Sequence, residues 1–329
     1  MKEQTSTPAI DQRTTTPRVR SLPSQPAAPD RLWIVLSFLA LYLIWGSTYF
    51  AISIAIKSIP PLLMAGVRFL MAGIVLYCLL RLRGTSSPTR KQWVGSAIVG
   101  LFLGVGGMGG VAFAEQWVAS SVTAFCIATT PLWISLFAGL WGRWPARTEW
   151  LGLLIGFIGV ICLNIGSGLW ASPLGAIILL LSPMCWAFGS AWSRHLALPG
   201  GLMASAAQML TGGVFLTLLG LAIGERPPGQ ITLSSILALA YLFIFGSLVA
   251  FTAYGYLLQR VRPALATSYA YINPLVAACL GILFASDHIT PLGIIGMLVI
   301  LTGVALVSLA HERKTTSASP TNVQAQSAQ

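Results

Sequence analysis

Arg68 is a charged residue within a long apolar run, PLLMAGVRFLMAGIVLYCLL, and lies seven residues after the proline that begins this run. In a helix, that spacing places it about 11 Å from the end of the run. If the run crosses a membrane, a cation at this depth is costly and is expected to pair or to face a cavity. Two interpretations are open. Arg68 snorkels to the lipid headgroups, or it faces the bundle interior, where it meets an acid or an anionic substrate group.

Glu115 is the acid that we expect to meet Arg68, because it ends a neighbouring apolar run on the same side of the membrane. An Arg68–Glu115 ion pair is therefore one prediction. Burial of Glu115 would make it a candidate proton carrier, because desolvation favours the protonated form of a carboxyl group. The alternative is an ordinary loop acid at the membrane interface.

Aromatic and amide side chains form a second group of candidates. Trp45 and Trp186 lie at similar depths in two apolar runs, 141 residues apart, and small residues follow each of them. Tyr269 and Asn273, at positions i and i+4, share one face of a helix. These features favour the wall of a cavity, with lipid-facing or packing roles as the alternative. The predicted substrate pathway comprises Trp45, Tyr49, Arg68, Trp186, Tyr269 and Asn273.

Pro131 and Pro274 each interrupt an apolar run and lie 143 residues apart. Proline removes one backbone donor and frees the carbonyl group four residues earlier, here that of Ile127 or Ala270. Lipid tolerates a freed carbonyl only where protein or a water-filled cavity satisfies it. Corresponding breaks in two half-chains indicate a binding site between repeats. Two harmless kinks are the alternative.

The composition places these residues in a membrane protein. Of 329 residues, 56% are hydrophobic and only 8% are charged, and the mean hydropathy is +0.80. A soluble domain carries about 25% charged residues, and an apolar helix of about 20 residues spans a bilayer. We therefore expect an all-α integral membrane protein with ten transmembrane helices, near 33–56, 61–80, 93–114, 117–141, 149–167, 173–193, 201–223, 234–258, 264–284 and 290–310.

The basic residues predict the orientation. With the N-terminus in the cytoplasm, sixteen Lys and Arg residues fall on the inside and two, Lys57 and Arg226, on the outside. Such a bias follows the positive-inside rule, so both termini are expected to be cytoplasmic. The net charge of +11 is then a topology signal rather than a nucleic-acid-binding surface.

The two halves of the chain repeat one another. The tryptophan pair is separated by 141 residues and the proline pair by 143, and a third pair, Gly152 and Gly296, is separated by 144. Each repeat contains five spans, and because five is odd the second repeat is expected to be inverted in the membrane. Polar residues at both ends cannot form a core. The predicted organisation is a disordered cytoplasmic tail (1–31), a first five-helix repeat (32–168), a second (169–310) and a second disordered cytoplasmic tail (311–329).

Several segments together resemble a known family. WGSTYF, AGVRFLMAG, AEQ, WAFGSAWSR and PALATSYAYINPLVA, in this order, are similar to the EamA-domain family of the drug/metabolite transporter superfamily, especially its YedA-like inner-membrane exporters. The resemblance covers roughly 33–310 and implies two packed repeats, alternating access around a central cavity and an inner-membrane location. The chain departs from the family's Gly-Glu pair after the fourth span, where it has Gly142, Arg143 and Trp144, and the second copy carries Asp287.

The motifs that are missing exclude other classes of protein. The sequence has no Walker A, HExxH or GxSxG motif and no Cys/His ligand cluster, so we expect no enzyme, cofactor or metal site. The five cysteines all lie in predicted spans and are expected to pack as small apolar residues.

We predict a secondary active transporter that exports small metabolites, amino acids or amphipathic compounds. Its partners would be a small-molecule substrate, a coupling proton or counter-substrate, and the lipid bilayer. The alternative is a non-transporting receptor, assembly factor or lipid-handling scaffold.

Overall fold

The computed structural model describes residues 28–142, 144–145, 147–167, 172–226, 229–261, 268–284 and 290–317, and the regular elements within these ranges are all helical. They form ten rods, some of them built from several helical segments. In chain order the rods are α1 (Ala28–Ala40), η1 (Leu41–Trp45) and α2 (Gly46–Ala55); α3 (Pro61–Leu82); α4 (Arg90–Val99), η2 (Gly100–Gly109) and α5 (Gly110–Ala114); α6 (Ser120–Ile127), α7 (Thr130–Ala138) and η3 (Gly139–Trp141); α8 (Arg147–Ser167); α9 (Pro173–Ser193); α10 (Leu202–Ala222); α11 (Leu233–Tyr241), η5 (Leu242–Val249) and α12 (Ala250–Arg260); α14 (Tyr269–Phe284); and α15 (Pro291–Ser317).

The lengths and surfaces of these rods suit a bilayer. Within the described ranges, seven helices are long and apolar enough to cross a membrane, and α8, α14 and α15 bring the rods to ten. On α8 the exposed side chains form an apolar stripe at helical spacing, consisting of Leu151, Leu154, Ile158, Ile161 and Ile165. Such a stripe would be unfavourable in water and suits acyl chains. The predicted ten-helix, all-α membrane protein is confirmed.

The outermost helices extend further than the sequence analysis expected. The first begins at Ala28, within the predicted N-terminal tail, and the last ends at Ser317, beyond the predicted start of the second tail. The prediction followed the apolar runs, but Glu, Arg and Lys are themselves good helix formers, and cations favour a helix C-terminus. The HERK segment at 311–314 therefore continues α15. The remaining tail residues, 1–27 and 318–329, lie outside the described residues.

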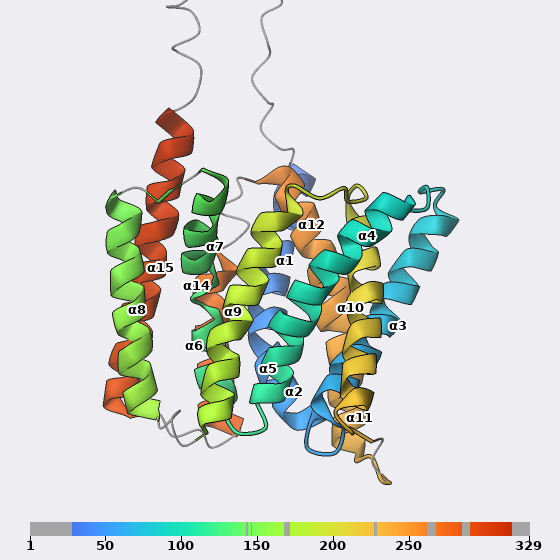
Figure 1. The fold of residues 1–329 in the computed structure, drawn as a ribbon, viewed down its shortest axis with the longest axis horizontal. Helices are drawn as coiled ribbons and strands as arrows, with labels where there is room; N and C mark the ends of the chain where they lie inside the picture. Colours follow the sequence, from blue (N-terminus) through green and yellow to red (C-terminus); the bar gives the residue numbers. More distant parts are fainter. Residues whose placement is uncertain are drawn as a thin grey trace, which may run out of the picture.

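Two pairs of rods lie at opposite edges of the bundle, α3 with α10 and α8 with α15 (Figure 1). Glycines bring the backbones of α3 and α10 together. A Cβ atom on Gly73 would lie 2.8 Å from the Leu210 backbone nitrogen, and one on Gly213 would lie 2.8 Å from that of Leu70. These contacts are reciprocal, because one offset relates Gly73 to Gly213 and Leu70 to Leu210 (213 − 73 = 210 − 70 = 140).

The same reciprocity holds between α8 and α15. A Cβ atom on Gly159 would lie 2.9 Å from the Gly296 carbonyl oxygen, and one on Gly303 would lie 2.7 Å from that of Gly152. The offset is 144 in both cases (303 − 159 = 296 − 152). Each helix thus packs against its equivalent in the other repeat, and every contact has a counterpart in which the two helices exchange roles, as a two-fold axis requires. Residue numbers rise along one helix as they fall along the other, so the copies are antiparallel and the predicted inverted repeat is confirmed.

The buried core also joins the repeats. One apolar cluster is formed by side chains of α6, α8, α9 and α15, including Phe125 and Ile300, and a second by side chains of α2, α3, α5, α10 and α11, including Phe69 and Leu216. Both clusters contain helices of both halves of the chain. Neither repeat therefore buries its apolar surface without the other.

Candidate functional site

Three rods change from α-helix to π-helix near their middle, at η1, η2 and η5. The segments η2 and η5 lie in the third rods of the two repeats, so they are equivalent. A π-helical turn shifts the backbone hydrogen-bond ladder and frequently marks a functional site. The candidate residues gather around these segments.

Arg68 is buried inside the bundle, with 2% of its side chain exposed. Its Nε donates a hydrogen bond to Ser247 Oγ, at 2.9 Å, across to η5. The guanidinium carbon lies 5.1 Å from the centroid of the Phe69 ring. A Cβ atom on Gly246 would come within 2.9 Å of Nη2, so this glycine makes room for the guanidinium group. The interior interpretation is correct, and Arg68 does not snorkel.

The structure does not form the expected ion pair between Arg68 and Glu115; among the described residues, the recorded polar contact of Arg68 is with Ser247. Glu115 follows directly after α5 and is 7% exposed. Arg68 instead lies about two helical turns inside its own rod, so the two groups differ in depth. Tyr49, another residue of the predicted pathway, packs against the second apolar cluster.

Trp45 connects η1 to η5. Its Nε1 donates to the Gly246 carbonyl oxygen at 3.1 Å. Gly246 therefore contacts both the Trp45 indole and the Arg68 guanidinium group. The Trp45 ring packs against three further rings, with centroid distances of 4.8 Å to Tyr269, 5.5 Å to Tyr254 and 5.3 Å to Phe251. Trp45, Tyr269 and Arg68 therefore belong to one cluster.

Asn273 lies beside this cluster on α14 and is 6% exposed. With its amide oriented to satisfy its surroundings, the nitrogen donates to the carbonyl oxygens of Tyr42 and Tyr269, at 3.3 and 3.2 Å. Asn273 thus links α14 to η1. The side chain of Tyr271 lies outside the described residues.

Trp186 lines a small cavity of about 40 Å³. The cavity is lined by residues of α3, η2, α9, α10 and α12, among them Phe69, Met108, Trp186, Gln208, Met209 and Phe251. It has room for water but not for a metabolite. A Cβ atom on Gly107 of η2 would lie 2.8 Å from the Trp186 ring. Trp186 therefore packs against η2 as Trp45 packs against η5.

Gln208 is the repeat equivalent of Arg68, a relation that the sequence analysis missed. Aligning VRFLMAG (67–73) with AQMLTGG (207–213) at the offset of 140 places Arg68 over Gln208. The short, weakly similar motif was a signal available in the sequence, and the reciprocal glycine contacts establish its register. Ser247, Gly246 and Phe251 were also missed, and no feature of their local sequence distinguishes them.

The two predicted proline breaks differ. Helices α6 and α7 separate at Ala128 and Thr129, and Pro131 lies in the first turn of α7. The carbonyl oxygen of Ile127, predicted to be freed, accepts a hydrogen bond of 2.6 Å from Thr130 Oγ1. Pro274 lies inside the continuous helix α14. The helix is therefore interrupted just before Pro131, as expected. The break expected at Pro274 is wrong, because α14 continues through this residue.

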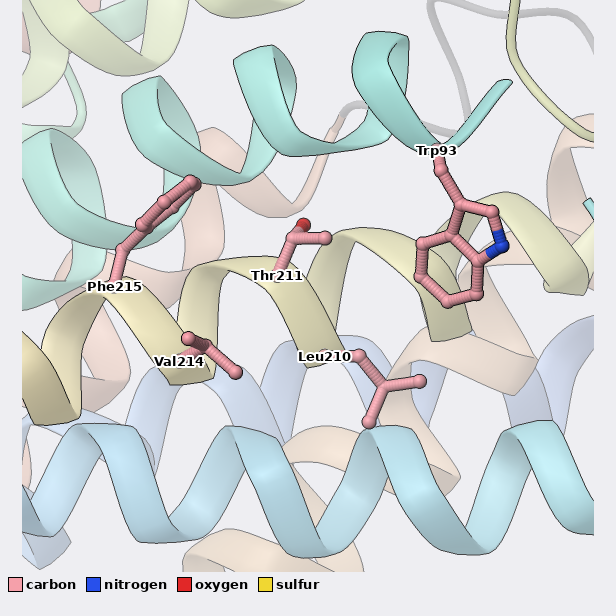
Figure 2. A pocket seen from close by; sticks show the side chains of 5 residues that line it. All are labelled: Trp93, Leu210, Thr211, Val214 and Phe215. Atoms are coloured by element: carbon pink, nitrogen blue, oxygen red, sulfur yellow. The ribbon is translucent and has the colours of Figure 1, made fainter. Parts of the chain in front are cut away.

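A larger groove of about 210 Å³ lies on the bundle surface between α4 and α10 (Figure 2). Its lining is apolar apart from the Trp93 indole N–H and Thr211, whose hydroxyl already donates to the carbonyl oxygens of Ser96 and Ala207 at 3.1 and 2.9 Å. Val214, also in the lining, is 44% exposed. This mainly apolar groove suits a lipid chain. Within the described ranges, no three His, Cys, Asp or Glu residues group to hold a metal ion.

Comparisons with known proteins agree with this architecture. The profile of the EamA-like transporter family matches residues 32–165 and again 173–309. The inner membrane transporter YedA of Escherichia coli K12 is 45% identical over 271 residues, which cover 82% of this chain and 89% of YedA. The transporter YoaV of Bacillus subtilis is 22% identical, covering 85% of this chain and 98% of YoaV. One solved crystal structure superposes with a TM-score of 0.60 at 21% identity, covering 84% of this chain and 98% of its own.

Proposed function

Because the chain belongs to the EamA-like transporter family, we propose that it is a secondary active transporter that exports small metabolites, amino acids or amphipathic compounds. The substrate passes between the two repeats by alternating access. The energy comes from the substrate gradient, from a coupled proton or from a counter-substrate. Glu115, a buried acid directly after α5, is the residue that we assign to a coupling role.

The reciprocal packing of equivalent helices carries this proposal. In an inverted repeat, each half can adopt the conformation of the other half, and the exchange moves the access path from one side of the membrane to the other. The cavity beside Gln208 lies among helices of both repeats, where such an exchange would open or close it. In this conformation the cavity has a volume of about 40 Å³.

We further propose that both termini lie in the cytoplasm of an inner-membrane protein. The support is the distribution of basic residues, sixteen against two, together with the likeness to an inner membrane transporter. Export then proceeds from the side of the bundle that holds the start of α1 and the end of α15.

Counterflow in proteoliposomes tests the function. Vesicles containing the purified protein are loaded with an unlabelled amino acid, organic acid or amphipathic amine, and uptake of trace labelled compound is followed. Transient accumulation above equilibrium is expected for at least one class of compound and not in protein-free vesicles. A folded, monodisperse protein that gives no counterflow with any class would contradict the proposal and favour a receptor or scaffold.

A further inference from the structure

Arg68 is a buried cation that uses one of its N–H donors toward the described residues of the protein. A guanidinium group has five N–H donors, and the recorded hydrogen bond is the one from Nε to Ser247. Among the described residues, no acid lies within ion-pair distance of this side chain. The neighbours of the guanidinium are instead the Phe69 ring and Gly246.

These neighbours stabilise the charge only in part. The face of an aromatic ring and one hydroxyl offset a fraction of the energy needed to remove a cation from water. The Nη1 and Nη2 groups, which form the two-pronged edge of the side chain, make no hydrogen bond to the described part of the chain. An anion that binds this edge supplies both the missing charge and the missing acceptors.

The repeat relation indicates how an anion reaches Arg68. Gln208, its equivalent, lines the cavity in this conformation, whereas Arg68 is held against η5 behind the Phe69 ring, which also lines the cavity. If the repeats exchange conformations, as alternating access requires, Arg68 would take the place of Gln208 at the cavity and Gln208 would be withdrawn. The Arg68 side chain would then be accessible to a solute.

We propose that Arg68 binds the carboxylate of a monoanionic substrate through Nη1 and Nη2 in that alternate conformation. The proposal rests on the transporter function and specifies its substrate class. A single guanidinium balances one negative charge, and a dianionic phosphate would leave an uncompensated charge among apolar groups. Phe69, Trp186 and Phe251 line the cavity, and Trp45 packs against Phe251, so we infer that the remainder of the substrate is apolar or aromatic.

Ligand-induced thermal stabilisation of the full-length protein in detergent tests this site. A ligand that binds only the folded state stabilises it by RT ln(1 + [L]/Kd), so at equal concentration the tighter ligand raises the melting temperature more. The probes are three acids, acetate, butyrate and 3-phenylpropionate, each compared with its uncharged amide. We expect 3-phenylpropionate to stabilise the protein and 3-phenylpropionamide to have little effect. Arg68→Gln should weaken acid binding about 10- to 100-fold, the range for a hydrogen bond to a charged group.

Two further variants separate binding from folding. Arg68→Lys keeps the charge but loses the planar fork, so it should retain part of the acid effect. Arg83→Gln makes the same charge change at an exposed position just beyond α3 and should behave as the parent protein. All variants are compared after confirming a monodisperse peak in size-exclusion chromatography.

The proposal is overturned if no acid stabilises the protein more than its amide, or if the acid effect persists in Arg68→Gln. Counterflow distinguishes this failure from failure of the transporter function. A protein that exchanges neutral or cationic compounds while ignoring the acids remains a transporter without a carboxylate site.

Discussion

Ser247 holds the charged side chain of Arg68 at the centre of the bundle. It accepts from Arg68 Nε at 2.9 Å and in turn donates to the Leu242 carbonyl oxygen at 3.2 Å. The serine therefore connects the cation of α3 to the backbone of η5. In a low-dielectric interior, such a chain of bonds is stronger than its members would be in water.

Replacing Ser247 by Ala should destabilise the folded protein by about 1.5–3 kcal/mol, because Arg68 Nε loses the hydroxyl oxygen to which it donates. Thermal unfolding in detergent measures the change. Ser234→Ala, at an exposed position in α11, should change the free energy of unfolding by less than about 0.5 kcal/mol. Equal melting temperatures for the two variants would show that the Arg68–Ser247 bond contributes nothing to stability.

The fourth rod shows how a helix break is tolerated in the membrane. The Cys126 and Ile127 carbonyl oxygens accept hydrogen bonds of 2.6 Å from the hydroxyls of Thr129 and Thr130. The Thr130 hydroxyl thus replaces the N–H that Pro131 lacks, whereas the Thr129 hydroxyl adds to the hydrogen bond of 3.2 Å from the Thr129 backbone N–H to the Cys126 carbonyl oxygen. Pro131 lies in the first turn of the next helix, where its missing N–H is not needed. The break is stabilised by its own sequence.

Replacing Thr130 by Val keeps the shape of the side chain and removes the donor to Ile127. The orphaned carbonyl should cost about 1–3 kcal/mol of folding free energy. The matched control is Thr252→Val, because the exposed Thr252 hydroxyl bonds to Leu248 within an ordinary helix. Thermal unfolding of both variants gives the comparison, and a loss at Thr252 as large as that at Thr130 would argue against a special role at the break.

At the scale of the whole molecule, the two-fold relation makes pairs of residues equivalent. Gly159 and Gly303 occupy the same position in α8 and α15, and each lies against the backbone of the other helix. Gly159→Ala and Gly303→Ala should therefore destabilise the bundle similarly, by about 1–3 kcal/mol each, since the added methyl group meets backbone that cannot move aside.

Gly200 supplies the control for this pair, because a Cβ atom there would have nothing within 4 Å. Gly200→Ala should leave the folded yield unchanged. Yield and melting temperature in detergent are the measurements. A severe loss in only one of the two helix variants would show that the equivalence of sequence positions does not extend to energetics.

The orientation of the molecule gives a further prediction. A reporter fused after Lys314 should be active only in the cytoplasm, and one inserted near Arg226 only outside, because cations on short loops resist translocation. Parallel fusions of alkaline phosphatase and green fluorescent protein measure both sides. A periplasmic signal after Lys314 would reverse the proposed direction of export.

By itself, the sequence determined the class of the protein, the order of its membrane helices and its duplication. Apolar runs of sufficient length specify helices in lipid, since no other open structure satisfies the backbone there. An odd number of spans per repeat then requires inversion. Residue types alone also singled out Arg68, Trp45 and Tyr269, because a charge or a clustered aromatic group in such runs needs a special environment.

Only the tertiary structure decided which groups these residues meet. Helices that are apolar on all sides carry no pattern that specifies their rotation about their own axes. The sequence therefore could not show that Arg68 turns to Ser247, 179 residues away, rather than to Glu115. The same rotation decides that Gln208 lines the cavity while its equivalent Arg68 does not. That difference depends on side-chain packing between helices, which is a property of the assembled bundle.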